Sequence, residues 1–239
     1  FDPLFLENLD SEIFDNIVAV LGCDKSEIRD VYPLKQGLTN LSCHFTTDDG
    51  EWVYRHPGVG TELIVNREAE HEALQTAKLL GLDSTFVFEN PRRGWKVSKF
   101  VTDAKNLDSH DDAQLERAMQ MARELHESGA SVGRSFSFYD EGKGYERAIL
   151  DRGRIDVPDY WEMEGWATEL NELLLADGGA PVLNHNDFFG LNFLVSKDGH
   201  VDLIDWEYAG MSDYANDFGT FCVCEQLSEE EMSRALHHY

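Results

Sequence analysis

Basic residues are scarce in this chain of 239 residues. Lysine and arginine together number 20 against 46 aspartates and glutamates, which gives a formal net charge of −26 at pH 7 and an isoelectric point near 4.5. Contact with nucleic-acid phosphates requires clustered Lys and Arg, so the composition excludes a nucleic-acid partner. The same deficit disfavours docking on anionic lipid. A solvated surface explains most of the acidic excess, with a field that attracts small cations as the alternative.

Apolar runs long enough for a membrane helix are also missing, since no stretch approaches about 18 apolar residues. The start, Phe1-Asp2-Pro3, has neither the basic nor the apolar region of a secretion signal. We therefore predict a cytoplasmic protein without membrane insertion. Because the chain lacks an initiator Met and ends at Tyr239 in a helix-like stretch, we expect it to be a portion of a longer chain.

Cysteine is rare as well, and the four present are scattered. Cys222 and Cys224 are separated by a single residue, which is too close for a zinc knuckle or a mutual disulfide. We expect reduced, buried thiols at all four positions, which are Cys23, Cys43, Cys222 and Cys224.

The chain has enough apolar residues (42%) and aromatic residues (11%) to bury a sizeable core. The predicted secondary structure changes from mainly strands to mainly helices near residue 102. We predict an α+β protein with two lobes: a β-rich lobe over residues 1–101, built on an antiparallel sheet, and a largely helical lobe over 102–239. The predicted helices are 11–21, 62–80, 111–127, 158–176 and 228–238; the predicted strands are 28–34, 41–47, 51–56, 84–89, 94–101, 192–196 and 201–204, with Asp48-Asp49-Gly50 as a hairpin turn.

Polar residues of catalytic type gather in the second lobe. Asp187 follows an apolar stretch, Asn192 comes five residues later, and Asp205 ends the apolar run before it. A hairpin between these segments would bring the three side chains together at the opening of one site. Carboxylate and amide oxygens suit Mg²⁺ together with substrate phosphates, and an Asp outside the metal shell could accept a proton from an attacking hydroxyl.

A metal-dependent hydrolase is the rival chemistry, because Asn184-His185-Asn186-Asp187 faintly resembles a metallophosphoesterase motif. Such a site also needs Asp-x-His at the end of an apolar strand. The only upstream match, Asp108-Ser109-His110, lies in a polar stretch with no strand before it, which disfavours this reading. We expect His185 to shape its loop by packing and hydrogen bonding and not to act as the base.

The spacing of His-x-Asp, Asn and apolar-apolar-Asp is the catalytic arrangement of eukaryotic-like kinases. The chain resembles the choline kinase and aminoglycoside phosphotransferase superfamily, and within it the bacterial choline kinases, over about residues 30 to 239. This resemblance implies a protein-kinase-like fold. Four stretches carry it: Gln36-Gly37-Leu38-Thr39-Asn40, Tyr54-Arg55-His56-Pro57-Gly58, His185-Asn186-Asp187 through Asn192, and Ile204-Asp205-Trp206-Glu207-Tyr208-Ala209-Gly210-Met211 continuing to Asp213 and Asp217.

The resemblance implies a role for each matching residue of the catalytic segment. Asp187 is expected to be the catalytic base, while Asn192 and Asp205 are expected to hold Mg²⁺ against the phosphates of ATP.

Nucleotide-binding residues are implied in the same way. Gly37, Thr39 and Asn40 belong to the phosphate loop, although Gln36 stands where the family often has a first glycine. Arg55 stands where protein kinases carry Lys, and Glu70 is favoured as its partner, with Glu68 and Glu72 left open. The adenine is expected against Lys99, Phe100 and Val101, where the lobes join.

The acceptor is expected to be a small cationic alcohol. A quaternary ammonium is recognised by aromatic faces and carboxylates, and Trp206, Tyr208 and Tyr214 beside Glu207 and Asp213 form a partial cage, with Tyr208 preferred. Choline is the favoured acceptor, yielding phosphocholine and ADP. Ethanolamine, thiamine and aminoglycosides stay open as acceptors, as does a non-catalytic, nucleotide-binding pseudokinase; the sequence does not indicate an oligomeric state.

Overall fold

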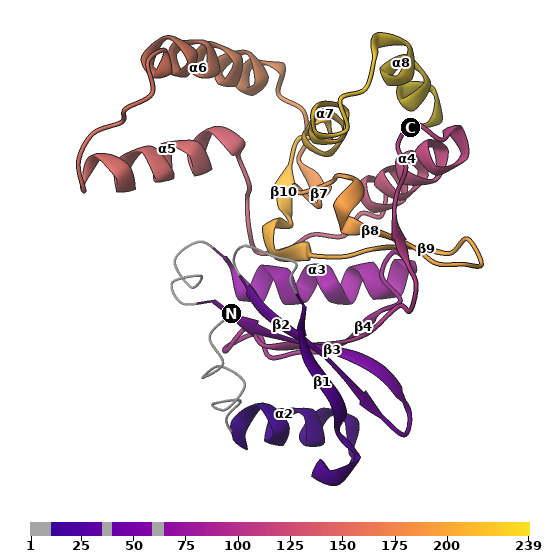
Figure 1. Cartoon of the computed structure of the whole chain (residues 1–239). Coiled ribbons are helices and arrows are strands. Elements are labelled where there is room, and N and C mark those ends of the chain that lie inside the picture. Colours follow the sequence, from indigo (N-terminus) through magenta and orange to yellow (C-terminus); the bar gives the residue numbers. More distant parts are fainter. Residues whose placement is uncertain (1–10, 35–39, 59–64) are drawn as a thin grey trace.

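The computed structural model describes residues 11–34, 40–58 and 65–239. The elements in chain order are α2 Ser11–Leu21, β1 Arg29–Leu34, β2 Asn40–Thr47, β3 Gly50–Pro57, α3 Arg67–Leu80, β4 Phe86–Glu89, β5 Lys96–Lys99, β6 Lys105–Asn106, α4 Asp112–His126, α5 Phe138–Leu150, α6 Tyr160–Asp177, β7 Val182–Asn184, β8 Phe193–Val195, β9 Val201–Leu203, β10 Gly210–Ser212, α7 Ala215–Cys224 and α8 Glu229–His238. An antiparallel sheet lobe followed by a helical lobe confirms the predicted fold class (Figure 1).

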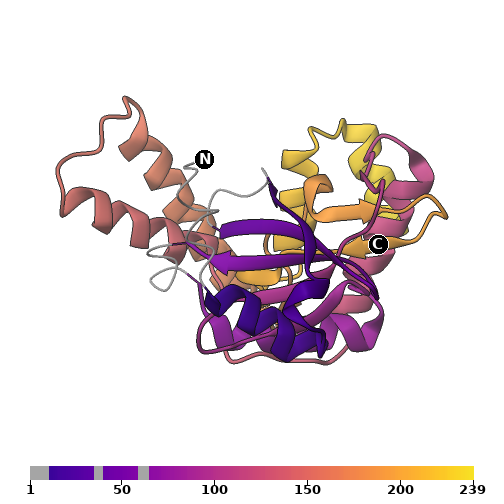
Figure 2. The same cartoon turned by 60° about the horizontal axis from the view of Figure 1, so that its bottom comes forward.

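The first lobe is a five-stranded antiparallel sheet in the order β1-β2-β3-β5-β4. The hairpin predicted at Asp48-Asp49-Gly50 joins β2 to β3, with Gly50 at a φ of 146° that a side chain would disfavour. Helix α2 packs on one face of the sheet through Ile13 and Ile17, and α3 lies on the other face (Figures 1 and 2). The sheet is therefore covered on both sides.

Helix α3 begins later than the predicted residue 62. The side chain of Asn66 accepts a hydrogen bond from the backbone N–H of Ala69 and so caps the helix, which then ends at Gly81 in a left-handed conformation. Residues 59–64, where the prediction began, lie outside the described residues. Because α3 also contacts the turn at Trp206–Tyr208, it joins the two lobes.

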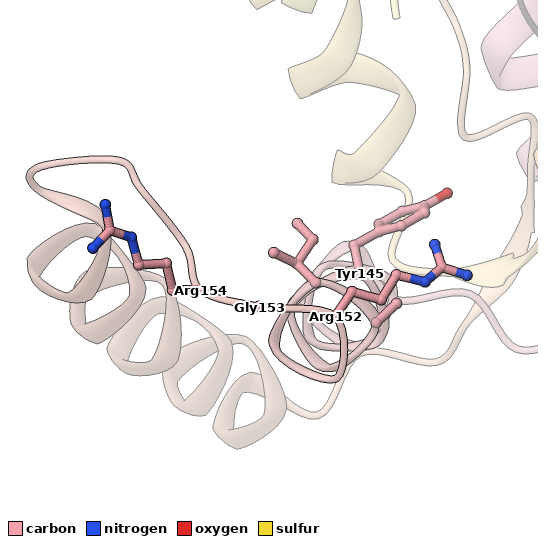
Figure 3. Close-up of a pocket in the computed structure, with 6 residues that line it drawn as sticks. Tyr145, Arg152, Gly153 and Arg154 are labelled. Atoms are coloured by element: carbon pink, nitrogen blue, oxygen red, sulfur yellow. The ribbon is translucent and has the colours of Figure 1, made fainter.

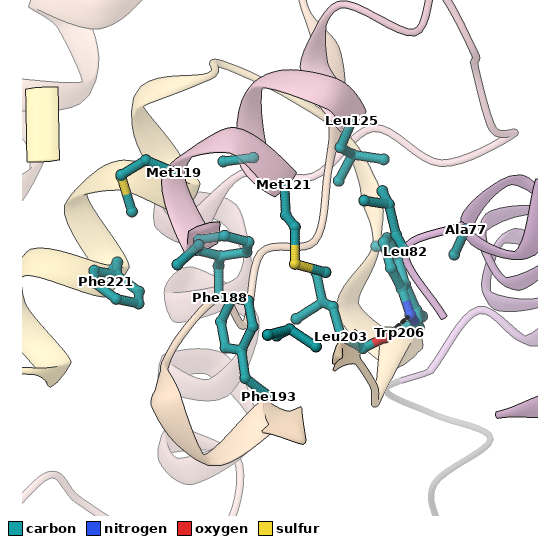
Figure 4. Close-up of a cluster of buried hydrophobic side chains, with 14 of the residues drawn as sticks. Ala77, Leu82, Met119, Met121, Leu125, Phe188, Phe193, Leu203, Trp206 and Phe221 are labelled. Carbon is teal, nitrogen blue, oxygen red and sulfur yellow. Dashed lines mark hydrogen bonds between the residues drawn. The ribbon is translucent and has the colours of Figure 1, made fainter. Parts of the chain in front are cut away.

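The main core runs from α3 into the helical lobe. Figure 4 shows Met119, Met121 and Leu125 of α4 facing Phe188, Phe193, Leu203 and Trp206 from the later segments. Two small sheets, β6-β8-β9 and β10-β7, lie on this core and carry the polar loops between them. The division at residues 101 and 102 stays a prediction.

Several elements differ from the sequence prediction. Helix α5 was not predicted, and neither were α7, β6 or β10. Helices α5 and α6 project from the helical lobe (Figure 1), and no residue of α6 is buried. All four cysteines are free, but Cys224 is exposed, contrary to the prediction, because it ends α7 on its solvent side. Among the described residues, no helix combines the length and apolarity needed to cross a membrane.

Two leucines of α3 provide a test of this packing. Leu74 is fully buried in the shared core, whereas Leu79 on the same helix is 87% exposed. We expect Leu74→Ala to lower the free energy of unfolding by about 2–5 kcal/mol, through lost burial and the cavity left behind. Leu79→Ala is expected to change it by less than about 0.5 kcal/mol. Urea unfolding of both variants measures the difference, and equal effects would contradict the placement of α3.

Candidate active site

The loop between β7 and β8 carries Asp187. Its carboxylate is half-buried, and Asn192, in a short turn over Gly190–Asn192, donates through Nδ2 to both Asp187 Oδ2 and the Asp187 carbonyl oxygen, each at 2.8 Å. Burial raises the pKa of the Asp187 carboxyl, and the nearby Asp205 carboxylate contributes in the same direction. The raised pKa makes Asp187 a better proton acceptor than an exposed aspartate.

The side chain of His185 packs against this loop from the protein interior. Its ring is fully buried, lies edge-on to Trp206 with centroids 4.7 Å apart, and places Nε2 3.0 Å from the carbonyl oxygen of Ile204. Because a carbonyl only accepts, Nε2 donates, and Nδ1 can then accept from the backbone N–H of Asp187 at 3.3 Å. Both ring nitrogens are occupied, in agreement with a loop-shaping role.

Asp217 of α7 holds the same loop from the other side. Its two carboxylate oxygens accept the backbone N–H groups of Asn186 at 2.7 Å and His185 at 2.9 Å. His126 of α4 contacts Asp217 Oδ2 through Nε2 at 3.0 Å, and its Nδ1 lies 2.8 Å from the Tyr239 hydroxyl. Asn186 has a φ of 63°, a conformation that these buried contacts maintain.

Asp205 follows β9 and is joined to the loop by the backbone. The N–H of Ile204 donates to the carbonyl oxygen of Asn192 at 2.8 Å. Asp205 has a φ of 69°, a left-handed conformation that is uncommon outside glycine. The structure thus brings Asp187, Asn192 and Asp205 together through direct contacts between their segments.

The oxygen donors here fit a hard cation such as Mg²⁺. Asn192 uses its amide nitrogen toward Asp187, which leaves its amide oxygen for another partner, and the Asp205 side chain is 39% exposed. Within the described ranges, no group of three His, Cys, Asp or Glu residues is placed to hold a metal. An ion would thus depend on few protein oxygens, with water and phosphate completing its shell, as Mg²⁺ prefers.

Arg55 of β3 is a buried cation surrounded by carboxylates. Its Nη2 donates to Glu70 and lies 3.5 Å from Glu89, while its Nη1 donates to Asp205 at 3.2 Å and lies 4.0 Å from Glu207. Burial works against the charge, but the carboxylates outweigh it and raise the pKa of Arg55 above its ordinary value.

Glu70 is the α3 residue that pairs with Arg55, as the sequence analysis favoured. Arg67 also donates to it at 2.8 Å, and Lys96 Nζ lies 3.8 Å away. Burial would raise the pKa of Glu70, but Arg55, Lys96 and Arg67 lower it to about 2. Glu72, one of the alternatives, instead accepts the backbone N–H of Gly133, and Glu68 is exposed.

The phosphate loop is described only at its end. Gly37 and Thr39 lie outside the described residues, whereas Asn40 begins β2 and donates through Nδ2 to Glu207 Oε2 at 2.8 Å. Glu207 was predicted to face the acceptor. Its buried carboxylate is instead oriented toward Asn40 and Arg55, because the short turn at Trp206–Tyr208 directs it to the sheet lobe.

The hinge residues lie at the end of β5. Lys99 is exposed, while Phe100 and Val101 are half-buried. The backbone N–H of Lys99 donates to Thr85 and that of Phe100 to Glu51, so Val101 is the remaining N–H of the three for a base edge. A nucleotide at this hinge stays a prediction.

Of the three aromatic residues predicted to form a cage, only Tyr208 has a suitable environment. Trp206 is fully buried and donates to the Leu203 carbonyl oxygen at 2.9 Å, and Tyr214 is exposed and stacks on Tyr239, so neither forms a cage wall. Tyr208 is half-buried, with Phe136 edge-on at 6.4 Å. Burial raises the pKa of Tyr208, and the adjacent Tyr145 adds to this.

The sequence analysis did not predict that Phe136 and Tyr145 lie beside Tyr208. Tyr145 belongs to the unpredicted helix α5, and only the Phe-Ser-Phe-Tyr aromatic run at 136–139 offered a signal. Asp213 was predicted to bind the acceptor, but its Oδ1 accepts the backbone N–H of Ala215 at 2.8 Å at the start of α7, a local role that accounts for its position.

A cavity of about 400 Å³ opens beside α5 and the loop that follows it (Figure 3). Its lining includes Tyr145, Ile149, Arg152 and Arg154. Asp187 is not among the lining residues, and the two arginines would repel a cationic acceptor. This cavity is therefore unsuited to the predicted substrate.

Comparisons with known proteins agree on one family. The chain is 26% identical to the choline kinase LicA of Streptococcus pneumoniae, with a TM-score of 0.84 over 97% of this chain and 80% of that one. A LicA structure solved with AMP gives 26% identity and a TM-score of 0.82, over 95% of this chain and 79% of that one. A choline/ethanolamine kinase family protein from Mesorhizobium loti, at 23% identity and a TM-score of 0.76, shares the fold over 95% of this chain and 74% of that one.

Among curated proteins, Protein LicA of Haemophilus influenzae is 24% identical over 215 residues, which is 85% of this chain but 60% of that protein. The chain thus spans less than two thirds of that relative's length. Residues 30–239 match the APH phosphotransferase enzyme family, so most of the chain, including the loops around Asp187 and Asp205, falls within the match. This chain belongs to the phosphotransferase enzyme family.

Proposed function

We propose that the protein is an ATP-dependent kinase that phosphorylates the hydroxyl of a small cationic alcohol, with choline favoured, forming phosphocholine and ADP. The observation that carries this proposal is the joining of Asp187, Asn192 and Asp205 in one site, with Arg55 bonded to Asp205. Similarity to the choline kinase LicA of S. pneumoniae supports the choice of acceptor.

The nucleotide is assigned to the junction of the lobes. Arg55, held by Glu70, presents its Nη1 side toward Asp205 and so toward the phosphates. We assign Gly37, Thr39 and Asn40 to phosphate binding, and Lys99, Phe100 and Val101 to the adenine. A LicA structure solved in complex with AMP supports a nucleotide as a ligand of this protein.

A magnesium ion would be held by Asn192 and Asp205. When bound, it supplies neutralisation of phosphate charge as the transferred group develops negative charge. The protein's contribution is to fix the two oxygen donors through the hydrogen bond between Ile204 and Asn192.

Asp187 is the proposed base. The acceptor hydroxyl attacks the γ-phosphorus and passes its proton to the Asp187 carboxylate, the new P–O bond forms, and the bond to the β-phosphate oxygen breaks to release ADP. The hydrogen bond from Asn192 orients the carboxylate for this step.

Tyr208 is the proposed aromatic contact of the acceptor ammonium, with Phe136 and Tyr145 beside it. Cation–π attraction contributes about 0.5–2 kcal/mol per ring.

A panel of acceptors tests the substrate class. We expect ATP consumption by the protein with choline, measured by a coupled assay, to exceed that with ethanolamine, thiamine or kanamycin. Faster turnover of another alcohol in the panel would replace choline as the acceptor. Nucleotide binding without turnover of any of them would instead support a non-catalytic pseudokinase.

Replacing the base tests the chemistry. We expect Asp187→Asn to lower kcat by about 10²–10⁴-fold, since proton transfer is lost, while the Kd for ATP stays within about twofold. Asp156→Asn, at a position where the side chain is 82% exposed, serves as the matched control and should keep full activity. Loss of ATP affinity in Asp187→Asn would indicate a metal-holding role for Asp187.

A pair of tyrosine variants tests whether Tyr208 contacts the acceptor. Tyr208→Leu is expected to raise the KM for choline by about 2- to 30-fold, the equivalent of one lost cation–π contact, with little change in the KM for ATP. Tyr214→Leu removes an exposed ring and should leave both constants unchanged. Steady-state kinetics measure both variants, and an unchanged choline KM in Tyr208→Leu would remove Tyr208 from the acceptor site.

A further inference from the structure

Glu89 is a buried acid that the mechanism above does not use. It ends β4, has no exposed surface, and pairs in the sheet with Lys96 of β5. Its Oε1 lies 3.5 Å from Arg55 Nη2, and its Oε2 lies 3.6 Å from His71 Nδ1. Neither oxygen makes a well-formed hydrogen bond to Arg55 or His71, and the group that shares a hydrogen bond with this carboxyl is Glu70.

Glu70 and Glu89 lie beside the same nitrogen of Arg55, and Glu70 accepts its hydrogen bond. Both carboxyl groups lie against Nη2 of Arg55, but the donated hydrogen bond goes to Glu70, which also takes one from Arg67. Two ionised carboxylates in one buried site repel each other. Burial, reinforced by the adjacent Glu70 carboxylate, raises the pKa of Glu89 to about 8. The arrangement therefore favours the negative charge on Glu70, which receives the hydrogen bonds of Arg55 and Arg67, and the neutral form of Glu89.

The charge balance around Arg55 explains why a neutral acid matters. Glu70 on the Nη2 side, with Asp205 and Glu207 on the Nη1 side, already supplies enough negative charge to hold the guanidinium. A further carboxylate would strengthen the hold of the protein on Arg55 and weaken its attraction to phosphate.

We propose that Glu89 is a positioning residue for Arg55: as a neutral acid it fills the space beside Nη2 without adding a further negative charge, so that the guanidinium keeps its attraction for nucleotide phosphates. The inference rests on the proposed function, in which Arg55 contacts ATP. It adds a residue that no motif in the sequence identified.

Ionisation of Glu89 then weakens nucleotide binding. The charged or titratable groups that face Glu89 are Arg55 of β3, Glu70 and His71 of α3 and Lys96 of β5, with Arg67 behind Glu70. Because other titratable groups lie nearby, a pH dependence alone would not identify Glu89 as its source. Glu89→Gln is the informative variant, since glutamine keeps the shape of the neutral acid and cannot ionise.

The binding experiment measures the Kd for ATP with Mg²⁺ at pH 7 and pH 9 by titration calorimetry. If only the protein with neutral Glu89 binds well, the Kd of the unsubstituted protein rises roughly tenfold over this range. Glu89→Gln is expected to match it at pH 7 and to stay within about twofold at pH 9. Glu68→Gln, an exposed residue of α3, is the matched control and should retain the tenfold rise.

A second measurement, without nucleotide, tests the protonation itself. A carboxyl with a raised folded-state pKa stabilises the fold below its unfolded pKa of about 4.3, and this stability is lost as pH rises toward 8. The urea midpoint of the unsubstituted protein should therefore fall relative to that of Glu89→Gln between pH 5 and pH 8.5.

The two readouts separate the possible failures. A constant difference in urea midpoint would overturn the neutral-acid assignment. A pH-dependent midpoint with a Kd for ATP that is equal at pH 7 and pH 9 would overturn the link from Glu89 to Arg55. A failure of the proposed function would instead appear as an absence of ATP binding at every pH, with the stability result unaffected.

Discussion

The guanidinium of Arg55 joins the parts of this molecule that must meet for phosphoryl transfer. It is bonded to α3 through Glu70 and to the segment after β9 through Asp205. Removing a cation from water is costly, and the cost is offset only when the carboxylates around it are well placed. The sheet lobe, α3 and the segment around Asp205 therefore depend on one another for position, and the positive charge lies where the proposed function places phosphate.

The loop that carries Asp187 is fixed by a separate set of contacts. Asp217 holds two successive backbone N–H groups, and His126 connects it to α4 and to Tyr239. Asp187 therefore has a rigid support made from parts of the chain distant in sequence. Preorganisation of this kind matters in phosphoryl transfer, where the protein positions groups and contributes little covalent chemistry.

The sheet lobe could be predicted from the sequence because its strands are long, their hairpin carries Asp48-Asp49-Gly50, and α3 has a clear apolar face. Helix α5 was harder to predict, since Gly142 and Gly144 within it have low helix propensity and apolar residues such as Ile149 are exposed. Strand β10 has three residues and exists through its pairing with β7, a contact that local pattern does not encode.

Motif spacing predicted that Asp187, Asn192 and Asp205 lie together, as the contacts between their segments show. The directions of neighbouring side chains were harder to anticipate. Trp206 and Glu207 are adjacent in sequence, yet one packs into the core and the other turns toward Asn40. Glu89 has no motif at all, and its environment arises only when β3, β4 and α3 are assembled.

The left-handed backbone at Asp205 has a consequence for how such a protein can evolve. A non-glycine residue in this conformation costs of order 1–3 kcal/mol, which the fold sustains at the position of the proposed metal ligand. Replacement by glycine would relieve that strain and remove the carboxylate in one step. Loss of catalysis would then bring a gain in stability, so a descendant freed from selection for turnover could keep its fold and persist as a binding protein.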